Sequence, residues 1–382
     1  MLSGCDILCL ANDWSADPTS KHHLMKRLSC DNRVLWVEVA GMRAPNLRHG
    51  KDWRRLARKA RSFMTPARSV LPGLSVYSPP AIPLPSSTFA RAVNTRLYTF
   101  TLQRELRRLG LSNAPVMWTY SPHVAPLIRD LPRRRLVYHC VDRWSEFAGY
   151  DGAMLDRMEA DICRNADVVF ASAQDLAERC RQHSDNVHYV PHGVDFAHFA
   201  RALEPGPLPA ELRDIPEPRV GFFGLIHEWV DVDLIRQLAE RTPYSYVLIG
   251  DAKAPLETLR GVPNVFHLGR RPYESLPDFC RGFQAAIVPF RQTALTRSVN
   301  PIKLREYAAA GLPVVSTDLP EVRRCADIAT CAIDLPSWLA AIDVAVHNGS
   351  DTIQRRAQSE RVRSQDWSAV TRRMAELVLA PG

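Results

Sequence analysis

The stretch 289–322 brings together residue types that can hold a phosphate and a diol. Asn300 is a strong helix N-cap and a proline follows it, so a helix is predicted to begin here and to end at Gly311. A helix N-terminus favours anions through its unpaired N–H groups and its partial positive charge. Lys303 adds a cation, and Glu306, one turn later, can accept two hydroxyl hydrogen bonds. A cation and amides for phosphates, followed by a carboxylate for a diol, predict a nucleotide-sugar site. Its residues would be Ser298, Val299, Asn300, Lys303 and Glu306. The alternative is an ordinary capped helix with a surface Lys and Glu.

In the first half of the chain, a carboxylate and an imidazole follow predicted strands. Asp142 comes directly after the apolar run Leu136–Val141, where a carboxylate can act as the general base for an acceptor hydroxyl; a helix or turn cap is the alternative. His123 lies just beyond another strand end and could contact donor or acceptor, although a lone His is more often structural. The predicted catalytic residues are therefore Asp142 and His123, and the predicted acceptor-side residues are Asp13, Lys21, His22 and Tyr120.

Two features of the second half bear on phosphates and metals. Gly224 follows the predicted strand Arg219–Phe223 and permits a close backbone approach, so the amides after it could face a diphosphate. Asp231 and Asp233 form a DxD pair, which is a metal motif in a different fold. We interpret them as helix-capping residues, because a hard cation needs more oxygen ligands than two carboxylates offer. No metal and no cofactor are expected beyond the nucleotide-sugar co-substrate.

Strands and helices in alternation must position these residues, and that alternation indicates open parallel sheets. Helical patterns such as Phe89–Leu109 and Met154–Asn165 separate short apolar runs, and the proline-rich stretch 78–87 is predicted to be a loop beside the cleft. The predicted strands are Asp6–Ala11, Arg33–Val39, Leu74–Tyr77, Val116–Tyr120, Leu136–Val141, Asp167–Ala171, Val187–Val190, Arg219–Phe223, Tyr244–Ile249, Asn264–Leu268, Ala285–Val288 and Leu312–Ser316.

The length of 382 residues predicts two domains. We place an acceptor-binding domain at 1–200, a nucleotide-sugar-binding domain at 201–350 and a C-terminal helical segment at 351–382. The proline-rich segment 204–218 follows the first boundary. Nine cysteines without a CxxC pair are typical of the reducing cytosol, and the N-terminus is expected to be a strand rather than a signal peptide.

The positive charge is concentrated in residues 1–135, which hold 22 Lys and Arg against 8 Asp and Glu. Such a surplus predicts an anionic partner, such as a membrane surface or a lipid-phosphate acceptor. Residues 53–64 have the pattern of a basic amphipathic helix, which either lies on an anionic membrane or packs on its own domain. Nucleic acid is not expected, because the glycine and aromatic motifs of its binding modules are missing. No apolar run is long enough to span a bilayer.

The segment 298–317 resembles the donor-binding motif of family-4-like glycosyltransferases with the GT-B fold, an E-x7-E element followed by an AxGxPVV strand. Glu306 matches the second Glu, which in that family holds the donor ribose, whereas Ser298 stands at the first Glu position. The sequence VPHGVD at 190–195 resembles the VPNGVD segment that ends the first domain. The resemblance implies two Rossmann-like domains facing each other across a cleft, with a C-terminal helix that crosses back. It also implies donor-binding roles for Gly250, Arg271 and Tyr273.

A second resemblance concerns Asp142. The sequence LVYHCVD, residues 136–142, is similar to the LVYxxxD element of bacterial glucuronosyltransferases of exopolysaccharide assembly, where the Asp is the proposed base. Similarity to teichuronic-acid type transferases points the same way. We therefore expect a cytoplasmic, peripheral-membrane transferase that moves a sugar from a nucleotide-diphosphate donor to a glycan or lipid-linked hydroxyl in cell-surface polysaccharide biosynthesis. The alternatives are a GT-B nucleotide-sugar 2-epimerase and a non-catalytic nucleotide-binding module.

Overall fold

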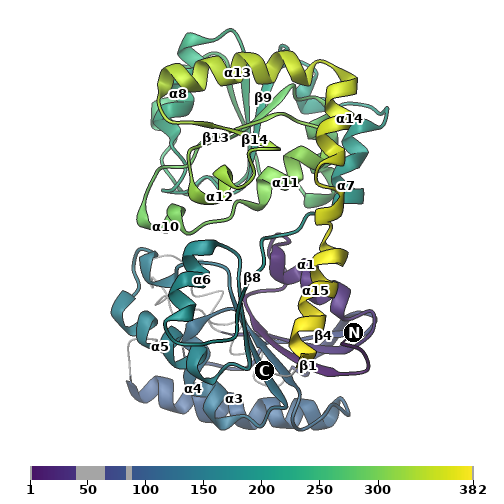
Figure 1. Cartoon of the computed structure of the whole chain (residues 1–382), viewed down its shortest axis with the longest axis vertical. Coiled ribbons are helices and arrows are strands. Elements are labelled where there is room, and N and C mark those ends of the chain that lie inside the picture. The colour runs from purple at the N-terminus through teal and green to yellow at the C-terminus, as the bar shows by residue number, and fades with distance from the viewer. Residues whose placement is uncertain (1, 40–64, 83–87, 381–382) are drawn as a thin grey trace. The chain divides into compact units, whose positions relative to one another are not determined.

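The computed structural model describes residues 2–39, 65–82 and 88–380, and the chain divides into two compact units (Figure 1). Unit 1 consists of residues 1–191 and 371–382, and unit 2 consists of residues 192–370. The first boundary thus falls before the predicted one at 200, because Val194, Phe196 and Phe199 are buried in the hydrophobic core of unit 2. The helix predicted at 53–64 lies outside the described residues.

Unit 1 is built on an eight-stranded sheet with the order β3-β4-β2-β1-β5-β6-β7-β8. All neighbouring strands pair in parallel except β3, which forms an antiparallel edge with β4. The parallel strands are apolar and buried, as expected for a sheet covered on both faces. The strands are β1 (Asp6–Ala11), β2 (Arg33–Glu38), β3 (Arg68–Leu71), β4 (Leu74–Tyr77), β5 (Val116–Thr119), β6 (Arg135–Cys140), β7 (Val168–Ala171) and β8 (Val187–Tyr189).

Right-handed crossovers fix the helices of unit 1 on the two faces of this sheet. The chain moves from β1 to β2 in one direction and from β5 through β8 in the other, so α1 lies on the face opposite α4, α5 and α6. Helix α3 leads to β5 and packs beside α4. The described helices are α1 (Ser20–Leu28), α3 (Thr88–Arg108), η2 (Pro122–Val124), α4 (Ala125–Asp130), η3 (Trp144–Glu146), α5 (Gly152–Asn165) and α6 (Gln174–Arg181).

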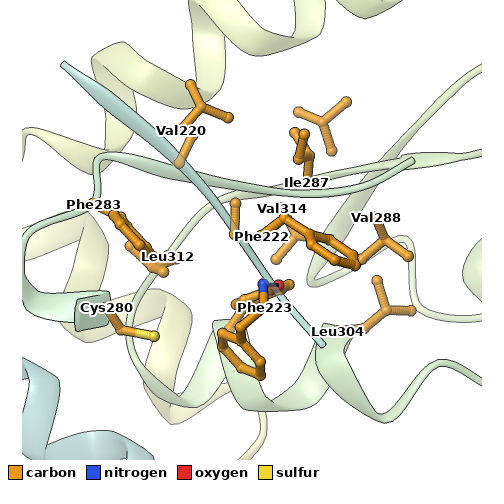
Figure 2. Packing of buried hydrophobic residues seen from close by; sticks show 14 of the residues in the cluster. Val220, Phe222, Phe223, Cys280, Phe283, Ile287, Val288, Leu304, Leu312 and Val314 are labelled. Carbon is orange, nitrogen blue, oxygen red and sulfur yellow. Dashed lines mark hydrogen bonds between the residues drawn. The ribbon is translucent and has the colours of Figure 1, made fainter. Parts of the chain in front are cut away.

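Unit 2 is built on a six-stranded, fully parallel sheet with the order β11-β10-β9-β12-β13-β14. Figure 2 shows part of its core, where Phe222 of β9 and Val314 of β13 lie among the buried side chains. Leu304 reaches the same cluster from a helix below the sheet. The strands are β9 (Arg219–Phe223), β10 (Ser245–Ile249), β11 (Val265–Gly269), β12 (Ala285–Val288), β13 (Val314–Thr317) and β14 (Ala329–Ala332).

Helices α8 and α13 pack together on one face of this second sheet, and α11 lies on the other face. Asp231 caps α8 by accepting a hydrogen bond from the Leu234 amide at 3.1 Å, which confirms the capping interpretation for Asp231, and Asp233 lies in the first turn of the same helix. The helices are α7 (Phe196–Ala200), η4 (Arg201–Leu203), η5 (Ala210–Leu212), α8 (Val232–Arg241), η6 (Glu257–Leu259), η7 (Tyr273–Ser275), α9 (Leu276–Arg281), α10 (Ala294–Arg297), α11 (Ile302–Ala309), α12 (Pro320–Arg323), α13 (Leu335–Gly349), α14 (Thr352–Glu360), η8 (Arg363–Gln365) and α15 (Trp367–Leu379).

The α/β class is confirmed, and so is each predicted strand to within two residues. Two strands were not predicted, β3 and β14. All nine cysteines are free thiols. Of the helices in the described segments, none has the length and apolar character needed to cross a bilayer.

Candidate functional site

In unit 2, the strand order reverses between β9 and β12, and α/β sheets bind ligands at such a point, beside the carboxyl ends of the strands. Two predicted glycines lie at this edge. Gly224 follows β9 with φ +135°, and Gly250 follows β10 with φ +143°. A Cβ atom at Gly250 would lie 2.0 Å from the Gly224 carbonyl oxygen, so a larger residue would push the two strand ends apart.

Lys303 crosses directly over Gly224. A Cβ atom at Gly224 would lie 2.2 Å from Cε and 2.8 Å from Nζ of Lys303, so the glycine leaves the space that the lysine side chain occupies. The close approach predicted at Gly224 therefore involves a lysine of this same unit. The ammonium group of Lys303 is thereby held at the carboxyl end of β9, next to the beginning of α11.

Tyr307 anchors α11 to the same strand. Its hydroxyl accepts a hydrogen bond from the Phe223 amide at 2.8 Å, and its ring meets the Phe223 ring edge-on at 4.5 Å between centroids. Leu304 and Tyr307 are fully buried, so one side of the helix is fixed against the sheet. Consequently Lys303 and Glu306 are carried by a helix with little freedom to shift.

Glu306 is a buried carboxyl group, with only 5% of the residue exposed. Burial raises its pKa to about 7; the positive charge of Lys303 acts in the opposite direction, and Asp195 adds a smaller increase. Within the described part of the chain, no hydrogen bond is donated to this carboxylate. The carboxylate is therefore available to accept hydrogen bonds from water or from the hydroxyl groups of a ligand.

The beginning of α11 differs from the prediction. The helix starts at Ile302 with Pro301 as its N-cap, whereas Asn300 does not cap it. The Asn300 side chain is buried and bonded at both ends: its amide donates to Glu321 Oε2 at 2.8 Å, and its carbonyl oxygen accepts from Arg305 at 2.8 Å. Arg305 also donates to Gln365 Oε1 at 2.7 Å.

This network replaces the predicted capping role of Asn300 with a supporting one. Asn300 holds the loop in front of α11 in place, and Ser298 is fully buried in that loop. Val299 is only partly buried and packs against the core of unit 2. Gly311 ends the helix as predicted, with φ +75°.

The two remaining donor-side residues have partners of their own. Arg271 forms an ion pair with Glu211 at 3.1 Å. The Tyr273 ring stacks on the His198 ring, with 4.5 Å between centroids, and meets the Phe199 ring edge-on. The Phe199 ring in turn stacks on the Phe223 ring. Tyr273 is thus connected to the strand end beside Gly224, whereas Arg271 is held by a neighbouring carboxylate.

In unit 1, the strand order reverses between β1 and β5. Lys21, near the start of α1, lies with its Nζ 5.5 Å from the Tyr120 ring and 5.7 Å from the Trp144 ring. It donates to Asn12 Oδ1 at 3.3 Å. The Trp144 indole donates to the Tyr120 carbonyl oxygen at 3.1 Å, which ties the turn after β6 to the end of β5.

Asp142 is part of this group. It is half-buried in that turn, and burial raises the pKa of its carboxyl group, whereas the charge of Lys21 lowers it. Lys21 shows the reciprocal effect: burial lowers its pKa, and Asp142 and Cys9 oppose that change. The structure therefore brings three sequence-predicted residues, Lys21, Tyr120 and Asp142, to one sheet edge, together with Trp144, which the sequence interpretation missed.

The other predicted residues of unit 1 have local roles. His22 is only 2% exposed, and its Nδ1 bonds to the backbone amide and hydroxyl of Thr19 as part of the α1 capping box. Burial lowers the His22 pKa to about 4, so the neutral ring is packed against Trp14 and Trp36 rather than presented to an acceptor.

His123 and Asp13 also interact within their own loops. The Nδ1 atom of His123 bonds to the Ser121 hydroxyl. Asp13 is exposed, and its carboxylate accepts hydrogen bonds from the Ser15 amide at 2.9 Å and from the Ser15 hydroxyl at 2.7 Å. Across 2–39, 65–82 and 88–380, no group of three or more His, Cys, Asp and Glu has a geometry that could hold a metal ion.

Two α/β units, each with a doubly wound sheet and polar groups at its switch point, have the arrangement of the GT-B fold with two Rossmann-like domains. The chain matches the family model described as Glycosyl transferases group 1 over residues 217–348. It is 23% identical over 261 residues to a putative teichuronic acid biosynthesis glycosyltransferase, TuaH, of Bacillus subtilis. That match covers 63% of this chain and 66% of the relative, slightly less than two thirds of its length.

Solved structures show the same fold over the whole chain. Sucrose-phosphate synthase from Thermosynechococcus elongatus aligns with a TM-score of 0.70 and 15% identity, covering 98% of both chains. HepE from Anabaena, in complex with UDP and glucose, aligns with a TM-score of 0.68 and 15% identity, covering 99% of this chain and 100% of its own. These likenesses confirm the GT-B prediction for the fold.

Proposed function

We propose that the protein transfers a sugar from a nucleotide-diphosphate sugar to a hydroxyl of a glycan or lipid-linked acceptor, in the biosynthesis of a cell-surface polysaccharide. One observation carries this proposal: Lys303 lies over Gly224 beside the start of α11, and the buried carboxylate of Glu306 follows one turn later. A cation for phosphates and a buried acceptor for a diol match the two polar parts of such a donor.

The donor site would work mainly by electrostatics. Lys303 and the backbone amides at the start of α11 would bind the diphosphate and stabilise the charge that develops on it as the bond to the sugar breaks. Glu306 would accept hydrogen bonds from two adjacent ribose hydroxyls. The complexes of HepE with UDP and glucose, and of an Escherichia coli trehalose-6-phosphate enzyme with UDP-2-fluoro glucose, support a nucleotide-sugar donor.

Asp142 would be the general base of the reaction. It would take the proton from the acceptor hydroxyl while the hydroxyl oxygen bonds to the anomeric carbon and the nucleotide diphosphate leaves, which inverts the configuration. Its place among Lys21, Tyr120 and Trp144, at the carboxyl edge of the unit 1 sheet, supports this role. The printed name of the Bacillus relative supports a polysaccharide acceptor, and the nine free cysteines support a cytoplasmic location.

Calorimetric titration of the protein with UDP-, GDP-, ADP- and dTDP-sugars tests the donor site. We expect one series to bind, and Glu306→Ala to weaken that binding by about 1.5–3 kcal/mol per hydrogen bond lost. Glu360→Ala is the matched control, because Glu360 is exposed on α14 and paired with Arg363. Unchanged affinity in Glu306→Ala would reject the assignment.

A second assay separates transfer from the two alternatives. Incubation with the donor alone should leave the sugar unchanged, and nucleotide release should rise when acceptor is added. Conversion of the donor without acceptor would instead indicate a 2-epimerase. Nucleotide binding without release under either condition would indicate a binding module.

A further inference from the structure

The outer side of α3 exposes two aromatic rings. Phe89 is 76% exposed and Phe100 is 63% exposed. Phe100 comes eleven positions after Phe89, which is about three helical turns, so both rings lie on one side of the helix. The opposite side is buried in the core of unit 1 through Tyr98, Leu102 and Leu106. Since burial of Phe is strongly favourable, two such rings on one exposed helix face indicate a surface that another body covers.

The same outer face is positively charged. Arg96, Arg104 and Arg107 are exposed and lie 7, 15 and 18 positions after Phe89, which brings all three close to the line of the two rings. The helix contains one acidic residue, Glu105. That residue is 3% exposed and paired with Arg108 at 2.8 Å, so it does not offset the charge of the outer face.

We propose that this face, formed by Phe89, Arg96, Phe100, Arg104 and Arg107, binds the surface of an anionic lipid bilayer. The two rings would insert among the headgroups and the three guanidinium groups would pair with lipid phosphates, the arrangement of a helix that lies in a membrane interface. Figure 1 shows α3 running along one side of unit 1, beside α4.

Charge favours a lipid surface over a second copy of the chain. A two-fold dimer through this face would bring its arginines against the same arginines, without a carboxylate on the face to separate them. The positive surplus of residues 1–135 adds a longer-range attraction to an anionic membrane. The inference adds a membrane partner to the proposed function and rests on it only for the lipid-linked acceptor; the binding itself needs no catalytic step.

Co-sedimentation of the full chain with vesicles tests the surface. We expect binding to vesicles that contain phosphatidylglycerol and little binding to pure phosphatidylcholine, with affinity falling as salt rises. The triple variant Arg96→Gln/Arg104→Gln/Arg107→Gln should bind at least about tenfold more weakly, since each basic residue near a membrane contributes about 1 kcal/mol. Phe89→Ser/Phe100→Ser should also lose binding, and the loss should persist at low salt.

Matched variants on unit 2 serve as controls. Arg213→Gln/Arg241→Gln/Arg260→Gln removes the same charge from exposed positions, and Ile333→Ser/Ile353→Ser removes apolar side chains that are 74% and 77% exposed. Both should keep vesicle binding. The unit 1 melting transition of the α3 variants should stay within a few degrees of the wild-type value, which shows that unit 1 is folded.

Several results would overturn the proposal: no binding by the wild type, equal loss in the control variants, or undiminished binding in both α3 variants. A wild-type dimer that the Phe89→Ser/Phe100→Ser change converts to a monomer in sedimentation velocity would show that a second copy covers the face. If vesicle binding follows the prediction but no nucleotide sugar binds, the proposed function fails and the membrane surface stands.

Discussion

At the scale of single residues, Glu306 combines a proposed role in donor binding with a cost in stability. Its pKa is raised from 4.5 to about 7 by burial, so the folded protein binds more protons than the unfolded chain between these values. Its contribution to stability is therefore full below about pH 4.5 and is lost as the pH rises through 7. A neutral group at this position should remove that loss.

Glu306→Gln should therefore make the fold more stable at pH 8 and leave it nearly unchanged at pH 4.5. A shift of this size corresponds to about 3 kcal/mol, which should raise the melting temperature of unit 2 by about 5 °C or more. Nucleotide affinity should fall in the same variant. Thermal unfolding at the two pH values measures the effect, and Glu360→Gln should gain nothing at pH 8. A Glu306→Gln protein that is less stable at pH 8 would show that the carboxylate is satisfied within the fold.

Asp142 and Lys21 are predicted to act as a pair in the proposed chemistry. Asp142→Asn keeps the shape and removes the base, so turnover should fall by about 10²–10⁴-fold with nucleotide affinity unchanged. The product, read by NMR, should be inverted relative to the donor. Near-normal turnover in Asp142→Asn, or retention of configuration, would leave Asp142 as a turn residue.

The Lys21 charge should appear in the pH profile. Because Lys21 lowers the pKa of Asp142, Lys21→Met should move the acidic limb of kcat/KM to higher pH. The other groups near Lys21 are Cys9 on β1 and Tyr120 just after β5, and the turn that holds Asp142 also contains the Arg143–Glu146 ion pair. Lys26→Met, on an exposed part of α1, is the control. If Lys21→Met lowers turnover but leaves the acidic limb of the kcat/KM profile at the same pH, Lys21 only supports the fold.

The sequence predicted which side chains lie at the carboxyl edge of a sheet. It did not predict which other side chains they pack against or bond to. Lys21, Tyr120 and Asp142 each follow an apolar strand or begin the helix after it, so the sequence placed them at one edge. His22 is the residue next to Lys21 at the start of α1, yet its ring packs against Trp14 and Trp36. Nor could the sequence show that Asn300 would bond to Arg305 and Glu321 instead of capping α11, because the Glu321 partner comes from α12, 21 residues away.

At the scale of elements, apolar runs between helical patterns fixed the buried strands closely. The two missed strands lack that signal. Strand β3, residues 68–71, is an exposed antiparallel edge. Strand β14, residues 329–332, is short, and two of its residues are alanine. An edge strand needs little apolar content, because its outer side faces water. The start of α11 was misplaced for a different reason, since tertiary hydrogen bonds outweighed the local capping preference of Asn300.

Arg305 is the element-scale test of how α11 is positioned. It is 3% exposed and joins α11 to the Asn300 loop and to Gln365. Arg305→Met should remove the hydrogen bonds to the buried Asn300 Oδ1 and the half-buried Gln365 Oε1, at a cost of about 1–3 kcal/mol for the buried one, and should weaken nucleotide binding as the loop relaxes. Arg305→Lys should recover only part of both, because one ammonium cannot reproduce the planar guanidinium.

Urea unfolding and calorimetric titration measure these two effects. Arg363→Met is the control, since Arg363 is 61% exposed in an ion pair with Glu360, and exposed pairs contribute little. If Arg305→Met loses stability but binds nucleotide normally, the network supports the fold and does not shape the donor site.

At the scale of the whole molecule, the hydrophobic clusters described in unit 1 and in unit 2 share no residue. It passes between the units twice, and the two passages lie side by side within unit 2: the Val194 amide donates to the Gln365 carbonyl oxygen at 3.0 Å, and the Trp367 amide donates to the Val194 carbonyl oxygen at 3.0 Å. Two domains were predictable from length and from the repeated alternation. The boundary was not, because the segment after Pro191 continues without a break in pattern and only its burial assigns it to unit 2.

Separate cores predict a separate melting transition for each unit, and the proposed donor-binding residues all belong to unit 2. Saturating UDP, at about 100 times its dissociation constant, should stabilise unit 2 by about 2.7 kcal/mol and raise its transition by about 5–10 °C. The unit 1 transition should not move. Lys303→Ala should abolish the shift, whereas Asp142→Asn should keep it, because Asp142 belongs to unit 1.

Core variants assign the two transitions in scanning calorimetry. Val220→Ala should lower the unit 2 transition and Leu35→Ala the unit 1 transition, since both side chains are fully buried and large-to-small changes in a core cost from about 0.5 to 5 kcal/mol. Suppose UDP raised the transition that Leu35→Ala lowers. The nucleotide would then bind to unit 1, and the assignment of Lys303 and Glu306 to the donor would be wrong. A single transition that moves as a whole would show instead that the two cores unfold together, and the location of the site would then depend on the Lys303→Ala and Glu306→Ala titrations alone.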